Sequence, residues 1–184
     1  YDAYVVLAIT QNRLNNFDEA LESYDEAFSY LDDLSNDSQY NLLIAQTLNN
    51  KANVFIELKE FEKAINAYNK ALKQNVKNQS DLLYAAILDN LAYAQFLAKQ
   101  GNPESLFKES LSIRSAINNK LGIVVSKKRL GEFYLHQKDT AQANSYLTEA
   151  YLLAKQTDFV KESLEILQLK AKAQPAKATE YLFK

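Results

Sequence analysis

The sequence predicts an all-α fold, a right-handed α-solenoid built of antiparallel helix pairs. One segment pattern recurs along the chain, most clearly as FDEALESYDEAF at 17–28 and FEKAINAYNKAL at 61–72. Further copies are RLGEFYLHQKDTAQANSYLTEAY at 129–151 and, more weakly, NLAYAQFLAKQGNPESLFKESL at 90–111. Equivalent positions follow one another at steps of 44, 39 and 40 residues, at Ala27, Ala71, Ser110 and Ala150. Only three glycines and two prolines interrupt 184 residues. A fixed period of this length with few helix breakers is typical of a helical solenoid.

The turn signals divide the chain into helices. In chain order, we expect them at about 1–13, 17–34, 38–58, 61–77, 81–99, from 103, 120–137, 140–156, from 159, and over 176–184. Two capping boxes are predicted, at Asn16 with Glu19 and at Asp139 with Gln142. Asp158 and Asn102 are further candidate N-caps, and Pro103 suits a first helical position because its missing N–H costs nothing there.

Alanines at regular spacing predict close contact between the two helices of each pair. Antiparallel helices joined by a two- or three-residue turn pack about 8–10 Å apart, and small side chains allow that approach. The alanines in question are Ala20, Ala27, Ala64, Ala71, Ala143 and Ala150. Large residues such as Tyr24 and Tyr68 fill the space beside them. Because one repeat cannot bury its own apolar face, we expect neighbouring repeats to stack.

Composition excludes several functional classes. A net charge of −2 leaves no electrostatic footprint for nucleic acid. No run of 18 apolar residues occurs, so we expect no membrane contact from this segment. The chain lacks cysteine and has one histidine, His136, which gives no metal-ligand set and no catalytic constellation. We therefore expect no enzyme activity, no metal and no cofactor. A chain without methionine that begins at Tyr1 indicates a segment of a longer protein.

The repeated pattern resembles the tetratricopeptide repeat. The residues that carry the resemblance are Leu7, Ala8, Phe17, Ala20, Tyr24 and Ala27; Ala52, Phe61, Ala64, Tyr68 and Ala71; Leu91, Ala92, Phe107 and Ser110; and Leu130, Gly131, Tyr134, Ala143 and Ala150. The repeats fall at about 1–36, 37–78, 79–118 and 119–157, with a degenerate fifth over 158–184, all in one domain. The third copy departs from the pattern, because its second helix starts late and Pro103 replaces the first small residue. The period near 40 resembles the long-helix subfamily of kinesin light chains, spindle-orientation adaptors and bacterial peptide-sensing regulators.

The resemblance implies a concave groove lined by the first helix of each pair. Groove positions in the second to fourth copies are Asn49, Asn50, Asn53, Asp89, Asn90, Tyr93, Lys128, Arg129 and Glu132. Asn50 and Asn90 sit where peptide-binding relatives often carry asparagine, whose amide donates and accepts at once and can hold an extended peptide by its backbone. The alternative is that these residues form a solvated helix face in an asparagine-rich protein.

A carboxylate clamp, as found in chaperone-binding relatives, is disfavoured. Asn53, Asn90 and Arg129 match three of its positions, but Asn49 and Val125 replace its two lysines. Without those ammonium groups, most of the charge that would hold a peptide carboxylate is missing.

The resemblance implies protein or peptide recognition, in one of two settings. The tail KESLEILQLKAKAQPAKATEYLFK resembles the irregular last repeat of arrays that precede the output domain of a bacterial histidine kinase or transcription regulator. This favours a sensory or regulatory region, which would lie outside the cytoplasmic membrane if it belongs to a sensor. The alternative is a stand-alone cytoplasmic scaffold that assembles partner proteins.

Overall fold

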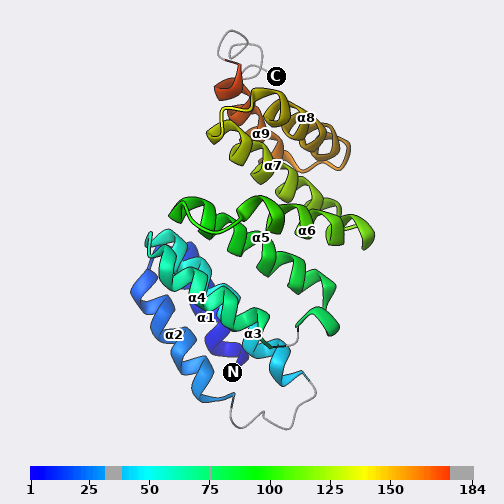
Figure 1. The fold of residues 1–184 in the computed structure, drawn as a ribbon. Helices are drawn as coiled ribbons and strands as arrows, with labels where there is room; N and C mark the ends of the chain where they lie inside the picture. The colour runs from blue at the N-terminus through cyan, green and yellow to red at the C-terminus, as the bar shows by residue number, and fades with distance from the viewer. Residues whose placement is uncertain (32–38, 75, 175–184) are drawn as a thin grey trace. The chain divides into compact units, whose positions relative to one another are not determined.

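The computed structural model describes residues 1–31, 39–74 and 76–174 (Figure 1). These residues form nine α-helices and one short 3₁₀ helix, with no strand among them, which confirms the all-α fold class. The helices are α1 (Asp2–Arg13), α2 (Phe17–Ser29), α3 (Tyr40–Glu57), α4 (Phe61–Leu72), η2 (Val76–Asn78), α5 (Asp81–Ala98), α6 (Pro103–Ala116), α7 (Lys120–His136), α8 (Thr140–Gln156) and α9 (Val160–Ala173). The predicted turn at 35–37 and the last predicted helix, 176–184, lie outside the described residues.

Two second helices are shorter than predicted. The pattern predicted helices over 17–34 and 61–77, whereas α2 ends at Ser29 and α4 ends at Leu72. After α4 the chain forms the 3₁₀ turn η2, whose Val76 is fully buried. Burying that side chain requires the chain to leave the α4 axis, so tertiary packing outweighs the helix propensity of the segment.

Six turns between helices share one geometry, the Schellman motif. Each holds a residue with φ between 54° and 63°, namely Asn15, Lys59, Lys99, Asn118, Lys138 and Asp158. In each, the next residue donates its N–H to the carbonyl five positions earlier, as Asp139 does to Tyr134 at 3.0 Å. These bonds satisfy carbonyls that the helix ends would leave unpaired.

This turn geometry decides which predicted caps form. The Asp139 side chain accepts the backbone N–H of Gln142 at 3.0 Å, so that cap is confirmed. The Asp158 prediction is wrong, because Asp158 is the left-handed residue of the turn and Phe159 is the N-cap of α9. Asn16 is the N-cap of α2 but makes no side-chain capping bond. Two caps were not predicted: Ser80 accepts from Leu83 at 3.2 Å, and Asn119 accepts from Gly122 at 3.0 Å.

The predicted small residues are the points of closest helix packing. Ala27, Ala71 and Ala150 are fully buried, as are Ala8, Ala52 and Ala92 at the equivalent position of the first helices. Gly131 is the fourth member of that second set, and a Cβ placed on it would lie 2.5 Å from Leu147 Cγ. The spacing of small residues therefore reports the tight contacts within helix pairs.

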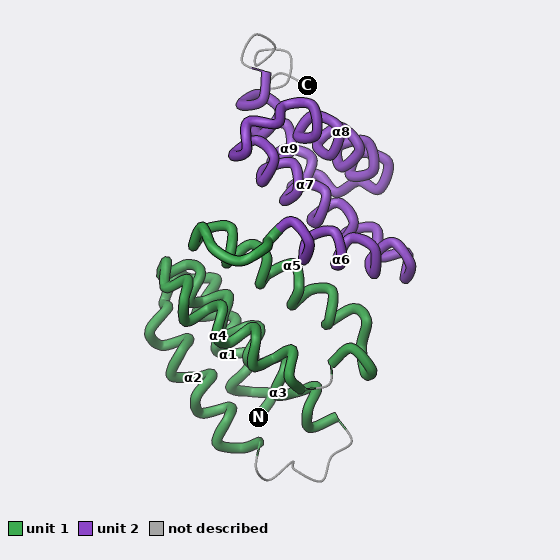
Figure 2. Tube along the Cα trace, viewed as in Figure 1, with its two compact units in different colours: residues 1–103 green, residues 104–184 purple. Residues whose placement is uncertain are grey.

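The chain forms two compact units, residues 1–103 and 104–184 (Figure 2). In the first, α1 packs with α2, α3 with α4, and α3 also contacts both α1 and α5. In the second, α7 packs with α8 and α9 covers both. The boundary runs through the third predicted repeat, the copy whose sequence departs from the pattern. That all 184 residues form one repeat domain stays a prediction.

Candidate functional site

Six of the predicted groove residues lie on adjacent first helices of the first unit. Asn49, Asn50 and Asn53 belong to α3, and Asp89, Asn90 and Tyr93 belong to α5. Because α3 packs against both α1 and α5, the three first helices of this unit form a continuous layer. We call the side of this layer that carries Asn50 of α3 and Asn90 of α5 the α1/α3/α5 face.

Three asparagines are linked across α3 and α5. Asn90 Nδ2 donates to Asn49 Oδ1 at 3.0 Å, and Asn49 Nδ2 donates to Asn50 Oδ1 at 3.3 Å. Asn49 is only 7% exposed, whereas Asn50 and Asn90 are half-buried. The middle amide is therefore part of the packing between the two helices, and the outer two reach the surface. Among the described residues, the Asn50 Nδ2 group has no hydrogen-bond partner.

The other predicted groove residues on this unit are wholly or partly buried. The buried Tyr68 hydroxyl donates to Asn53 Oδ1 at 2.6 Å, so the Asn53 carbonyl is used within the α3–α4 pair. Asp89 is fully buried and presents no carboxylate at the surface. The Tyr93 ring is half-buried and lies 6.2 Å from the ring of Phe96. Of the six, Asn50, Asn53, Asn90 and Tyr93 are partly exposed, and the Asn53 oxygen is already bonded to Tyr68.

The remaining groove residues belong to α7, in the second unit. Lys128 forms an ion pair with Glu165 of α9, so its charge is balanced internally. Glu132 lines a small hollow of about 260 Å³ together with Leu135, His136, Leu169 and Lys172. Arg129 is half-buried. That Arg129 shares one concave surface with Asn50 and Asn90 stays a prediction.

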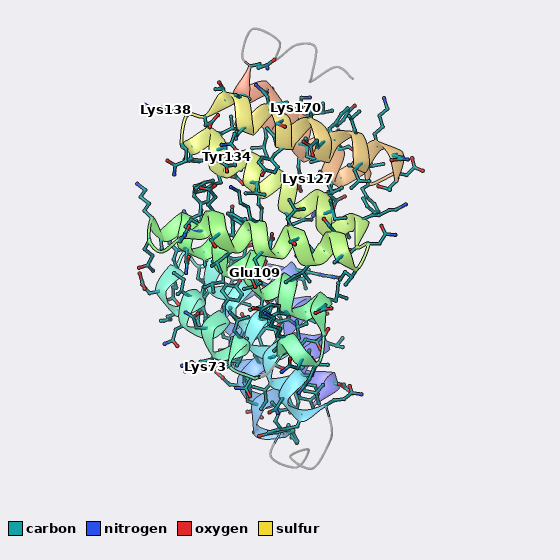
Figure 3. The ribbon with its side chains drawn as sticks, turned by 45° about the vertical axis from the view of Figure 1, so that its right-hand side comes forward. Lys73, Glu109, Lys127, Tyr134, Lys138 and Lys170 are labelled. Atoms are coloured by element: carbon teal, nitrogen blue, oxygen red, sulfur yellow. The ribbon has the colours of Figure 1, made fainter. Side chains whose placement is uncertain are left out.

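Other charged side chains of the second unit are hydrogen-bonded; Figure 3 labels Tyr134 and Lys127, which take part in these bonds. The Tyr134 hydroxyl donates to Glu104 Oε1 at 2.7 Å, and Lys108 Nζ lies 2.5 Å from the same oxygen. The hydrogen bond from Lys108, followed by that from Tyr134, lowers the pKa of Glu104. Lys127 likewise lowers the pKa of Glu149 through a 2.5 Å bond from α7 to α8. The Tyr134–Glu104 bond joins α7 to α6 and the Lys127–Glu149 pair joins α7 to α8, whereas Lys108 and Glu104 lie one turn apart on α6.

Among the described residues, no group of three or more His, Asp or Glu side chains is placed to hold a metal ion. His136 is exposed at the end of α7. No helix within the described ranges has the length and hydropathy needed to cross a bilayer.

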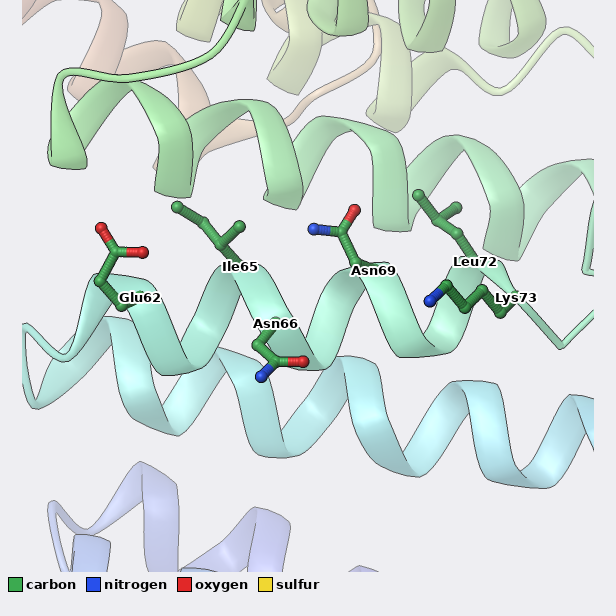
Figure 4. A pocket seen from close by; sticks show the side chains of 6 residues that line it. All are labelled: Glu62, Ile65, Asn66, Asn69, Leu72 and Lys73. Atoms are coloured by element: carbon green, nitrogen blue, oxygen red, sulfur yellow. The ribbon is translucent and has the colours of Figure 1, made fainter.

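A hollow of about 750 Å³ along α4 was not predicted (Figure 4). Its lining comes from α4 and the C-cap residue that follows it: Glu62, Ile65, Asn66, Asn69, Leu72 and Lys73. The only signal in the sequence is the seven-residue spacing of Ile65 and Leu72, which places two apolar side chains on one side of the helix. The lining mixes apolar, amide and charged groups and has no cluster of reactive side chains.

Comparison with known families identifies two segments of the first unit. Two sequence models, each described as tetratricopeptide repeat, match residues 1–30 and 45–78. These two segments are tetratricopeptide repeats. The first covers the α1–α2 pair, and the second runs from within α3 through α4 to η2. The other described helices are consistent with the same solenoid fold, and α7 and α8 form a further packed pair. Tetratricopeptide repeats generally mediate protein–protein interaction, and they bind protein or peptide partners.

A solved structure shows the same fold over nearly the whole chain. The crystal structure of BtubC (BKLC) from P. vanneervenii matches with a TM-score of 0.76 at 19% sequence identity. The match covers 99% of this chain and 75% of that chain. At this level of identity the likeness establishes the fold alone. The search of curated proteins gave no match.

Proposed function

We propose that this chain is a protein- or peptide-binding module and that its α1/α3/α5 face holds an extended peptide segment. The observation that carries the proposal is the chain of amides from Asn90 through the buried Asn49 to Asn50. Asn49 fixes the two outer side chains, so the Asn50 amide enters binding with little rotamer freedom left to lose. A side-chain amide held in this way can donate to a peptide carbonyl.

The apolar character of the neighbouring helix supports the same face. Val6 occupies on α1 the position that Asn50 occupies on α3, two residues before a fully buried alanine. Its side chain is 63% exposed. An exposed apolar group beside a fixed amide is the combination that gives a peptide site both burial and direction.

The cellular setting we favour is the sensory or regulatory region of a larger bacterial signalling protein, a histidine kinase or a transcription regulator. The repeat period near 40 residues and the sequence after α8, which departs from the repeat pattern, support this setting. A sensor would place the repeats outside the cytoplasmic membrane. The competing proposal is a stand-alone scaffold, supported by the general role of tetratricopeptide repeats in protein–protein interaction. The full-length gene separates them: a signal peptide upstream and an apolar segment with an output domain downstream fit only the sensor.

The test of peptide binding begins with capture of a partner by the immobilised chain, followed by titration of that partner against variants. Asn50→Ala should weaken binding by about 1–3 kcal/mol, because a peptide carbonyl loses its donor. Asn69→Ala is the matched control, an exposed asparagine on the second helix of the same pair. Asn90→Ala is less informative, since it also leaves the buried Asn49 Oδ1 without its donor. Equal affinity of the Asn50 and Asn69 variants would refute the proposal.

A further inference from the structure

A second hollow lies on the first unit, its lining includes neither Asn50 nor Asn90, and sequence reasoning missed it. It has a volume of about 260 Å³ and collects side chains from α2, α3 and α4. Its apolar lining consists of Phe28, Leu48, Phe55 and Ala67, with Asn66 at one side. Three lysines complete it: Lys51, Lys63 and Lys70. We call it the lysine-rimmed hollow. No acidic residue belongs to its lining.

The three lysines differ in how their charge is balanced. Lys51 is paired with Asp25 of α2, and Lys63 lies 2.9 Å from Glu60 at the start of its own helix. Lys63 also lies over the Phe55 ring, 5.6 Å from its centroid, which holds the cation at the edge of the apolar floor. Lys70 has no acidic partner among the described residues. The rim thus carries an excess of positive charge over an aromatic floor.

From this hollow we infer a second interaction surface, which takes an acidic amphipathic helix of a partner protein. The volume is below the roughly 300–1,000 Å³ of sites that enclose a whole small molecule, and suits one or two apolar side chains. Those side chains would pack on Phe28 and Phe55, while acidic groups beside them meet Lys63 and Lys70. Burial of the apolar anchor supplies affinity, and the lysines select acidic partners.

The spacing of the lysines favours a helix over an extended segment. Lys63 and Lys70 are seven residues apart on α4, which is about 10.5 Å along a helix axis. A partner helix lying along α4 has the same spacing between acidic residues at positions i and i+7. Its apolar side chains at positions i+3 and i+4 then lie between the two acidic residues, on the same side of the helix. In an extended strand, side chains on one face recur about every 6.8 Å, so no two of them are separated by the spacing of Lys63 and Lys70.

The surroundings disfavour nucleic acid as the occupant. Asp25 and Glu60 lie beside two of the three lysines and would repel a phosphate backbone. The aromatic floor offers apolar packing, and the chain as a whole has a net charge of −2. Recognition therefore depends on apolar burial and a few charges together.

The test uses phage-displayed 15-residue random peptides selected on the immobilised chain. Selection should enrich peptides with acidic residues seven apart and Leu or Phe between them. The best of these, made synthetically, should bind K63Q/K70Q about tenfold more weakly than the parent. It should bind the control K73Q/K155Q, which loses the same charge at exposed sites outside the hollow, within about twofold of the parent. Thermal melts by circular dichroism establish that each variant is folded.

Charge reversal provides the second measurement. K63E/K70E should enrich peptides with basic residues at the same spacing. Failure to enrich acidic peptides, equal affinity for K63Q/K70Q and the parent, or loss of binding in Asn50→Ala would each overturn the inference. Heparin displacing the peptide from the parent as effectively as unlabelled peptide would also overturn it, because charge alone would then explain binding.

Discussion

Gly131→Ala probes a close contact between α7 and α8 in the second unit. The new Cβ would lie 2.5 Å from Leu147 Cγ and 2.6 Å from Leu147 Cδ2. Leu147 is fully buried and packs with Val124, Ala150 and Ile166, so its side chain has no open space to move into. Overpacking of this kind costs about 1–3 kcal/mol. Alanine in place of glycine in a helix contributes about 1 kcal/mol in the opposite direction. We expect a net loss of about 1 kcal/mol in the free energy of unfolding.

Urea denaturation followed by circular dichroism measures this loss, and Ser112 supplies the control. Ser112 is exposed on α6, so the difference between Ser112→Ala and Ser112→Gly reports helix propensity alone. In the background Leu147→Ala, the methyl group added at Gly131 has room, and Gly131→Ala should then stabilise the fold. If Gly131→Ala stabilises the parent as much as the Ser112 pair predicts, the reasoning about close packing is refuted.

Three further predictions concern stability. Lys138→Gly should raise the free energy of unfolding by up to about 1 kcal/mol, because Lys138 has φ 63° and glycine adopts that conformation without strain. The midpoint of urea denaturation measures this change, and a lower midpoint in the variant would contradict it. Deleting 159–184 removes α9, whose Ile166 covers the core of the second unit. The truncated chain should melt at a lower temperature and aggregate more readily, and an unchanged melting temperature would contradict the role of α9. Because Lys108 and Tyr134 lower the pKa of Glu104 in the folded state, their stabilisation is present above the unfolded pKa and is lost as pH falls through the folded pKa. As the pH is lowered beyond about 4.5, the melting temperature of the parent should therefore decrease. The decrease should be less steep in Glu104→Gln. An equal dependence of melting temperature on pH in parent and variant would count against this prediction.

Local sequence features predicted the helix pairs well. A small residue at a helix crossing is a requirement of geometry, so the buried positions of Ala27, Ala71 and Ala150 could be predicted from their spacing. Turn chemistry was harder to read, because an acidic residue before a helix is equally suited to a cap or to a left-handed position. Asp139 takes the first role and Asp158 takes the second.

The candidate site was predicted less completely, since periodicity assigns a residue to a helix face but not to a depth. Asn49 and Asp89 are both buried, although each lies one residue from a half-buried neighbour on the predicted face. The Asn53 carbonyl is used by Tyr68, a contact between residues 15 positions apart. The lysine-rimmed hollow needs side chains from three helices, and no single segment of sequence carries that information.

The side-chain amide signals of Asn50 test the central claim most directly. In ¹H–¹⁵N spectra of the labelled chain, the captured partner or a peptide derived from it should shift the Asn50 Nδ2 resonances, while those of Asn69 on α4 stay in place. This result follows if the α1/α3/α5 face holds the peptide through the Asn50 amide. Saturating partner that leaves the Asn50 signals unchanged would contradict the account.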